Sequence, residues 1–148
     1  MIAMSNRIGL FRILAYAFVG GMLLAACSSD RSPDAGDRTI QVDGQAVAAS
    51  SLRQAVTGLC TALERLPIDP TAARRAFYDL SHDRLHTIAA AVQDIDRPAA
   101  TSLLNAKAVV EEDLARFPFP SSLAADLDRL AAASRAALRV LSVPAEPC

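Results

Sequence analysis

The sequence predicts an all-α protein, an antiparallel up-down four-helix bundle that follows a signal peptide and a flexible tether. The apolar residues are mostly Ala and Leu, with no Trp and few aromatic residues, and this composition favours helices. Apolar residues recur every three or four positions in four successive segments. Short, proline-containing breaks separate the segments, and short connections place consecutive helices side by side and antiparallel.

The first 26 residues have the pattern of a secretory signal peptide. Arg7 and Arg12 give them positive charge, and the run from Ile13 to Ala26 is almost wholly apolar or small. A retained transmembrane helix is the alternative. However, this run is shorter than the roughly 20 apolar residues of a membrane span, and Gly20-Gly21 weakens it as a helix. We therefore expect an exported protein.

The residues Leu24-Ala25-Ala26-Cys27 close this run and resemble the lipobox of bacterial lipoproteins. The resemblance implies that the Cys27 thiol receives a diacylglyceryl group, that cleavage follows on its amino side, and that the new α-amine is a further site for a palmitate-type acyl chain. Two or more chains form a stable anchor, since each buried CH₂ contributes about 0.8 kcal/mol. The implied location is the outer face of the cell membrane. The alternative is a plain signal peptide followed by a coincidental cysteine.

The mature chain would then be Cys27–Cys148, enough for one domain. Residues 27–45 are predicted to be a flexible tether, because they are mostly polar and rich in helix breakers. Within them Thr39–Asp43 alternates polar and apolar residues and can form a short extended piece, but too little follows to make a sheet. The helical domain is placed at residues 46–148.

Pro67 separates the first two expected helices. The first begins between Ala46 and Ser51 and ends at Leu66, and the second, capped by Asp69, runs from Pro70 to Ile95. The residues expected on the buried face of the first helix are Leu52, Val56, Leu59, Leu63 and Leu66. Those of the second are Phe77, Leu80, Leu85, Ile88, Val92 and Ile95.

The third helix is expected over Pro98–Arg116 and the fourth over Leu123–Leu141, with Ser121-Ser122 as its cap. Pro118-Phe119-Pro120 separates the two. The buried stripe of the third helix is Ala100, Leu103, Val110, Leu114 and Phe117. That of the fourth is Leu123, Leu127, Leu130, Ser134, Leu138 and Leu141.

Cys60 and Cys148 remain once Cys27 carries lipid, and two thiols in an exported protein usually form a disulfide. In the expected topology the fourth helix ends near the start of the first. The tail 142–148 spans at most roughly 20–25 Å when extended. Cys60 lies some 14 Å along the first helix, so the tail can reach it. Two free thiols are the alternative.

His82 and His86 are the only histidines, and they are one turn apart on the same face of one expected helix. Two neutral imidazoles so placed can share a metal ion, and Asp79 can add an oxygen ligand. Glu111 and Glu112 are the best candidates from a facing helix. A helical wheel places both histidines on the flank or outer face, where solvated side chains are expected. A solvent-facing role is therefore our main interpretation, and a divalent-metal site is the alternative.

Arg84 and Lys107 fall within apolar stripes. Pairing the second and third helices about a turn near Arg97 places Arg84 level with Glu111, with Lys107 one turn away from Glu111. We expect a semi-buried Arg84–Glu111 ion pair that fixes the register of the two helices. In the alternative, Arg84 and Lys107 bind a ligand carboxylate.

Composition and motifs argue against nucleic-acid binding and catalysis. Without Arg7 and Arg12, 13 of the 15 basic residues remain against 16 acidic ones, and no basic patch is present. The sequence has no G-x-S-x-G, S-x-x-K or H-E-x-x-H motif, and a catalytic Cys60–His86 pair is disfavoured because Cys60 has an expected partner. We expect a non-enzymatic domain without a cofactor that binds a protein or another envelope component.

The segment Ala76–Leu114 resembles small helical lipoproteins of high-GC bacteria, some of which accompany iron or copper handling. The residues that carry the resemblance are Phe77-Tyr78-Asp79, His82, Leu85-His86, Ala106-Lys107 and Glu111. The resemblance implies, as the alternative function, copper, zinc or iron handling through His82 and His86.

Overall fold

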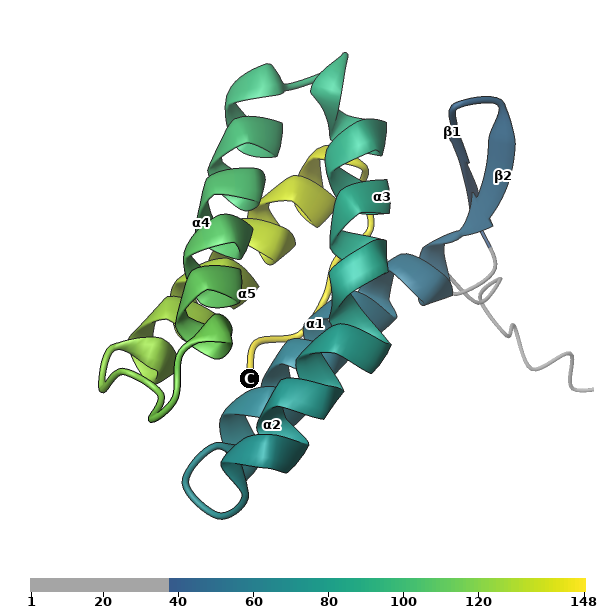
Figure 1. Cartoon of the computed structure of the whole chain (residues 1–148). Helices are drawn as coiled ribbons and strands as arrows, with labels where there is room; N and C mark the ends of the chain where they lie inside the picture. Colours follow the sequence, from purple (N-terminus) through teal and green to yellow (C-terminus); the bar gives the residue numbers. More distant parts are fainter. Residues whose placement is uncertain (1–37) are drawn as a thin grey trace, which may run out of the picture. The chain divides into compact units, whose positions relative to one another are not determined.

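The computed structural model describes residues 38–148, and most of these residues are helical (Figure 1). The predicted signal peptide, Cys27 and most of the predicted tether lie outside the described residues. The two strands are β1 (Thr39–Val42) and β2 (Gln45–Ala48). The α-helices are α1 (Ala49–Arg65), α2 (Pro70–Ala76), α3 (Asp83–Gln93), α4 (Arg97–Ala115) and α5 (Leu123–Val140), and a π-helical segment, η1 (Phe77–His82), joins α2 to α3.

The strands form an antiparallel hairpin, so the predictions of a tether reaching residue 45 and of no sheet were wrong. Thr39 pairs with Ala48, and Val42 pairs with Gln45. Asp43-Gly44 forms the turn with φ values of 49° and 78°. A two-residue turn with positive φ at both positions matches the twist of the flanking strands, and Asp-Gly is a preferred sequence for it. The hairpin contacts α3 through β1 and continues directly into α1.

The segment from α2 through η1 to α3 is one continuous helical run, and it corresponds to the second predicted helix. This run contacts α1, α3 contacts α4, α4 contacts α5, and α5 returns to contact α1. The predicted stripes of all four segments meet in one core of buried apolar side chains. Three predicted stripe residues are instead exposed: Leu80, Ile95 and Phe117. Ile95 and Phe117 are exposed because α3 and α4 end before they reach them.

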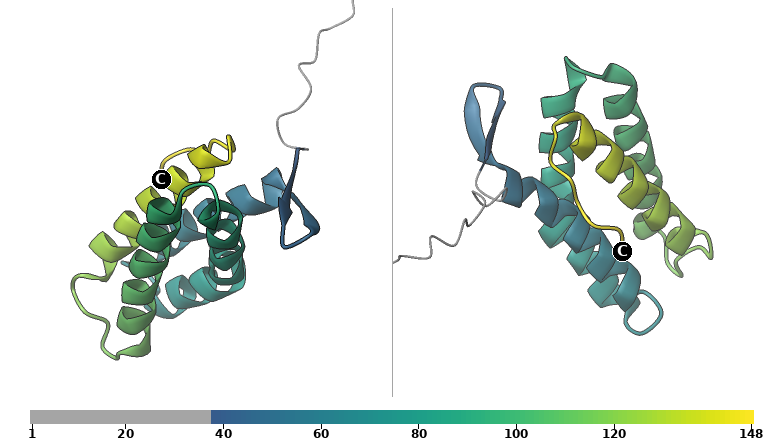
Figure 2. Two further views of the ribbon diagram at one scale, coloured as in Figure 1. Left: turned by 90° about the horizontal axis from the view of Figure 1, so that it is seen from above. Right: turned by 180° about the vertical axis from the view of Figure 1, so that it is seen from behind.

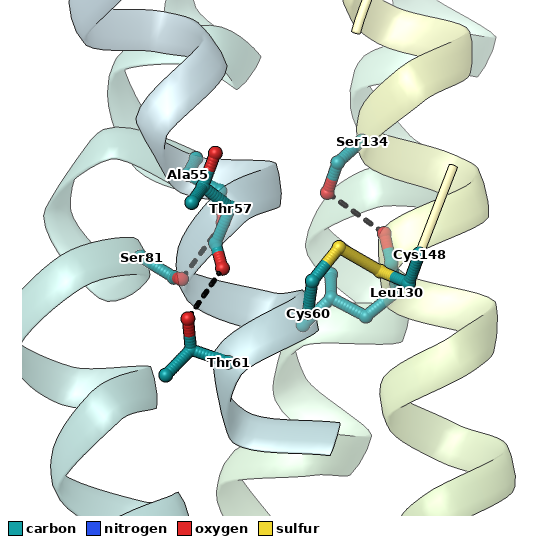
Figure 3. Close-up of a disulfide and its surroundings, with 8 residues drawn as sticks. All are labelled: Ala55, Thr57, Cys60, Thr61, Ser81, Leu130, Ser134 and Cys148. Carbon is teal, nitrogen blue, oxygen red and sulfur yellow. Dashed lines mark hydrogen bonds between the residues drawn. A yellow bond between two sulfur atoms is a disulfide. The ribbon is translucent and has the colours of Figure 1, made fainter. Parts of the chain in front are cut away.

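The π-helical turn explains why Leu80 is exposed. Phe77 and Leu85 are eight residues apart, and in an α-helix the second would point about 80° past the first. The wider η1 turn takes up this difference, so both side chains are fully buried. Ser81 then faces α1, where its hydroxyl donates a hydrogen bond to the Ala55 carbonyl oxygen at 2.8 Å (Figure 3).

The helix ends follow their predicted signals in most places. The predicted cap Asp69 accepts a hydrogen bond from the Ala72 amide at 2.9 Å. Asp96, which was not predicted as a cap, accepts from the Ala99 amide at the start of α4 in the same way. Ser122 precedes α5 but its side chain makes no cap hydrogen bond, so the predicted serine cap was wrong; its hydroxyl lies against Asp113 instead. None of the helices in residues 38–148 is long and apolar enough to cross a membrane.

The C-terminal tail returns to α1, where Cys60 and Cys148 form the predicted disulfide (Figures 2 and 3). α5 ends in a Schellman motif: the Val143 amide donates to the Leu138 carbonyl and the Ser142 amide to the Arg139 carbonyl, both at 2.9 Å. Ser142 adopts the left-handed conformation that this motif requires, with φ of 56°. The motif turns the chain back and buries Val143.

Candidate functional site

Tyr78, His82 and His86 form a row of rings along η1 and α3. The ring centroids of Tyr78 and His82 are 5.5 Å apart, and those of His82 and His86 are 5.3 Å apart. His82 is half-buried and His86 is exposed. The spacing of one turn therefore gives the predicted juxtaposition of the two imidazoles.

His82 lies between two carboxylates. Its Nδ1 is 2.8 Å from Asp83 Oδ1, and its Nε2 is 2.8 Å from Glu111 Oε1 on α4. A protonated ring donates to both oxygens, whereas a neutral ring donates to one. Both ring nitrogens thus face acceptors rather than an open coordination position.

The predicted metal set does not assemble as one centre. Of its four residues, Glu111 contacts His82, His86 lies beside His82, and Asp79 is exposed to solvent. Within residues 38–148 there is no group of three or more His, Cys, Asp and Glu side chains that could hold a metal ion.

Glu111 pairs with Lys107 and not with Arg84, so the predicted Arg84–Glu111 ion pair was wrong. Lys107 Nζ is 2.6 Å from Glu111 Oε1, and the lysine is only 2% exposed. Arg84 instead donates from Nη1 to the carbonyl oxygen of Leu80 at 3.0 Å. The π-helical turn changes the phase of the helix, and it brings His82 rather than Arg84 against α4.

Neighbouring charges shift the pKa values of Glu111 and His86. Burial by itself would raise the pKa of Glu111, but the hydrogen bond and charge of Lys107, together with His82, hold that pKa below its ordinary value. The pKa of His86 is lowered, first by burial and then by the positive charges of Lys107 and His82. The neutral imidazole of His86 is therefore favoured in the folded protein.

A buried pair of acidic residues, Asp113 on α4 and Asp126 on α5, was not predicted. Both side chains are buried. The pKa of Asp113 is raised by burial and by the hydrogen bond and charge of Asp126, against opposing contributions from Ser122 and Arg116. Arg129 pairs with Asp126 from the surface. Each aspartate lies three residues after a stripe residue, which is the signal in the sequence that marks a buried position.

An exposed apolar surface lies where the α1–α2 and α4–α5 connections meet. We refer to it as the apolar end surface. The residues that line its cavity of about 480 Å³ are Leu66, Pro70, Phe117, Pro118, Phe119, Pro120, Ser121 and Ala124. Phe117 is 92% exposed, and its ring lies edge-on to Phe119 with the centroids 6.3 Å apart. Ile68, in the neighbouring α1–α2 connection, is also largely exposed.

Comparisons with known proteins do not assign a role to any of these residues. No protein-family model matches the chain, and no curated protein or solved structure matches it either.

Proposed function

We propose that this protein is an exported, lipid-anchored, non-enzymatic domain that binds a partner protein through the apolar end surface. The lipobox pattern at Leu24–Cys27 supports attachment through Cys27 to the outer face of the cell membrane. The lack of catalytic motifs in the sequence supports a binding role. The cyclic contacts among the four helical segments support an up-down antiparallel bundle as the scaffold.

The observation that carries the binding proposal is the convergence of apolar side chains around one cavity, with Phe117 largely exposed and Leu66 and Phe119 half-buried. Single exposed apolar residues are ordinary on protein surfaces. Here two connections far apart in the sequence supply Leu66 and Pro70 on one side and Phe117 and Phe119 on the other. Burying one phenylalanine side chain contributes about 1.5–3 kcal/mol, and aromatic anchors beside pockets dominate protein interfaces.

The backbone of this surface is constrained before any partner binds. Pro118 and Pro120 flank Phe119, and each proline fixes its own φ angle. A surface that is ordered in advance loses less conformational entropy on binding. The two prolines therefore favour a defined binding surface.

The charges beside the surface favour a protein over a lipid bilayer as the partner. Surfaces that lie on anionic membranes carry unpaired Lys and Arg around their apolar face. Here Arg116, which directly precedes Phe117, is paired with Glu112 on α4. The cavity is also concave and suits a protruding side chain.

Site-specific photo-crosslinking tests the proposal. A benzophenone amino acid replaces Phe117 in the full chain, and the matched control replaces Ala108, an exposed residue of α4. We expect one discrete protein adduct in intact cells from position 117 and none from position 108. The purified adduct partner should then bind the Phe117→Asp variant about tenfold more weakly or worse, and the Ala108→Asp variant normally.

Three outcomes contradict binding at this surface: no adduct at position 117, equal adducts at both positions, or unchanged affinity of Phe117→Asp. The anchor is tested separately, by metabolic labelling with a clickable palmitate analogue. Wild-type protein should carry the label in the membrane fraction, and Cys27→Ser should not. Label retained by Cys27→Ser would rule out attachment through that residue.

A further inference from the structure

A second cavity, of about 420 Å³, lies between the hairpin, the start of α1 and α3. β1 contacts α3, and the hairpin joins α1 directly, so residues of all three elements line this open cavity. Val42 and Val47 of the hairpin and Ala90 of α3 supply apolar wall, and Thr87 supplies a hydroxyl. The volume is in the range of small-molecule sites.

Arg84 lines this cavity with a guanidinium group that lacks a carboxylate partner among residues 38–148. Nη1 donates to the Leu80 carbonyl, which holds the side chain against its own helix. Nε is buried and has no hydrogen-bond partner in the described part of the chain. A guanidinium keeps its charge and presents its donors in a planar fork that matches the two oxygens of a carboxylate.

The cavity also contains one carboxylate, Asp43 at the hairpin turn. Asp43 is exposed to solvent and makes no ion pair with Arg84, although both line the same cavity. The wall therefore presents one cation without a carboxylate partner, one separate anion, apolar surface, and the uncharged polar side chains of Gln45, Ser51 and Thr87. His86 also lines the cavity, and its lowered pKa favours the neutral imidazole. A single cation matches a ligand with a single negative charge better than a phosphate dianion, which is usually held by several donors.

We propose that this cavity binds a small organic carboxylate with an apolar body, and that Arg84 is the residue that holds the carboxylate. Two ligand types share this chemistry. A simple carboxylic acid uses Arg84 alone, whereas an amino acid also places its ammonium group near Asp43. The site is separate from the apolar end surface, so either proposal can fail without the other.

Binding of probe compounds to the full chain tests the site, with affinities measured by calorimetry and ligand-observed NMR. The probes are 3-phenylpropionate, its neutral analogue 3-phenylpropan-1-ol, and phenylalanine. We expect saturable binding of 3-phenylpropionate and at least about tenfold weaker binding of the alcohol, because the alcohol lacks the charged hydrogen bonds to Arg84. Tighter binding of phenylalanine that is lost in Asp43→Asn identifies an amino-acid site, and equal binding identifies a plain carboxylate site.

Matched variants separate the role of Arg84 from general charge. Arg84→Gln should weaken 3-phenylpropionate binding at least about tenfold, whereas Arg75→Gln, which removes the same charge from the exposed face of α2, should leave it unchanged. Ala90→Phe keeps Arg84 but fills the cavity, and it should also abolish binding. Circular dichroism checks that each variant folds. Normal binding by Arg84→Gln, normal binding by Ala90→Phe, or equal binding of the alcohol would overturn the proposal.

Discussion

Glu111 is the residue that keeps the buried Lys107 paired. The ammonium group lies in the core with Glu111 as its hydrogen-bond partner, and the glutamate is itself about one-third exposed. Removing one member of a buried pair leaves an uncompensated charge and costs about 3–5 kcal/mol when both are fully buried. We expect Glu111→Gln to lower the free energy of unfolding by about 2 kcal/mol in urea titrations, a reduced value because Glu111 is partly solvated.

Glu112→Gln is the matched control, since the neighbouring glutamate pairs with Arg116 on the surface. It should change stability by less than about 0.5 kcal/mol. Because the folded-state pKa of Glu111 lies below its ordinary value of 4.5, its contribution is present above that value and is lost as the pH falls through the lowered pKa. The gap between wild type and Glu111→Gln should therefore narrow in acid. Equal effects of the two variants at neutral pH would argue against this role for Glu111.

The contribution of Asp113 to stability should depend on pH in the opposite direction from that of Glu111. Its pKa is raised, so any stability it contributes is present below the ordinary aspartate pKa of 3.8 and is lost as the pH rises through the folded-state value. At neutral pH an ionised Asp113 would sit beside Asp126 in a buried site. Asn has the same shape and can donate to Asp126 without charge.

We therefore expect Asp113→Asn to raise the midpoint of urea unfolding at pH 7, by about 1 kcal/mol in free energy. The gain should shrink as the pH falls through the raised pKa of Asp113, because the wild-type carboxyl group becomes protonated there. Asp128→Asn, an exposed change on α5, provides the control and should have little effect. A loss of stability in Asp113→Asn at pH 7 would show that the ionised carboxylate is needed.

At the scale of elements, α1 approaches η1 closely at Gly58. A Cβ built at Gly58 would lie 2.3 Å from the Ser81 Oγ and 2.6 Å from the Leu80 Cβ. Alanine has a helix propensity about 1 kcal/mol better than glycine, but overpacking of this kind costs about 1–3 kcal/mol or more. We expect Gly58→Ala to destabilise the protein by about 2 kcal/mol, measured by urea unfolding.

The double variant Gly58→Ala/Ser81→Ala tests whether this contact is the cause. Removing the Ser81 hydroxyl opens space for the new Cβ, while the Leu80 Cβ remains in the way. The double variant should therefore be more stable, by about 1 kcal/mol, than the sum of the two single changes predicts. If the effects of the two single changes on the free energy of unfolding simply add, or if Gly58→Ala is as stable as wild type, then α1 and η1 can move apart to make room for the new Cβ.

The contact between α1 and η1 also shows which features of the fold sequence patterns cannot predict. Apolar periodicity, the cap Asp69 and the prolines between the segments predicted the helices because these signals are local. The π-helical turn depends on packing between segments, and its change of phase decides that His82 rather than Arg84 meets Glu111. The sequence therefore predicted which charged residues lie close together, but not which of them form ion pairs.

The hairpin was missed for a different reason. Asp43-Gly44 is a recognised turn signal that the sequence does contain. The second strand, Gln45–Ala48, is short, rich in alanine and continuous with α1, so its pattern does not differ from that of a helix start. The cavity of Arg84 depends on this hairpin, and it could not be foreseen without it.

At the scale of the whole described domain, two contacts hold the C-terminal tail, one to Arg38 at the start of the domain and one to α1. Arg38 Nη2 donates to the Ser142 carbonyl at 2.6 Å, and the Cys60–Cys148 disulfide joins residues 88 positions apart. The Schellman motif and the buried Val143 hold the tail independently of the sulfur atoms. Beyond Val143, the tail is held by the disulfide and by Ala145, which packs against the core.

The disulfide should therefore stabilise the protein mainly by restricting the unfolded chain. A loop of this length corresponds to about 4–5 kcal/mol in the chain-entropy model, and measured values are often lower. We expect Cys60→Ser/Cys148→Ser to unfold at lower urea concentration, with wild type in reductant matching it. Backbone NMR shifts of the folded variant should change only in the tail and near Val56 and Thr57, which line the cavity beside Cys60. Shifts spread through α3 and α4 would show that the disulfide organises the folded core, and unchanged urea stability would show that the unfolded chain is not restricted by it.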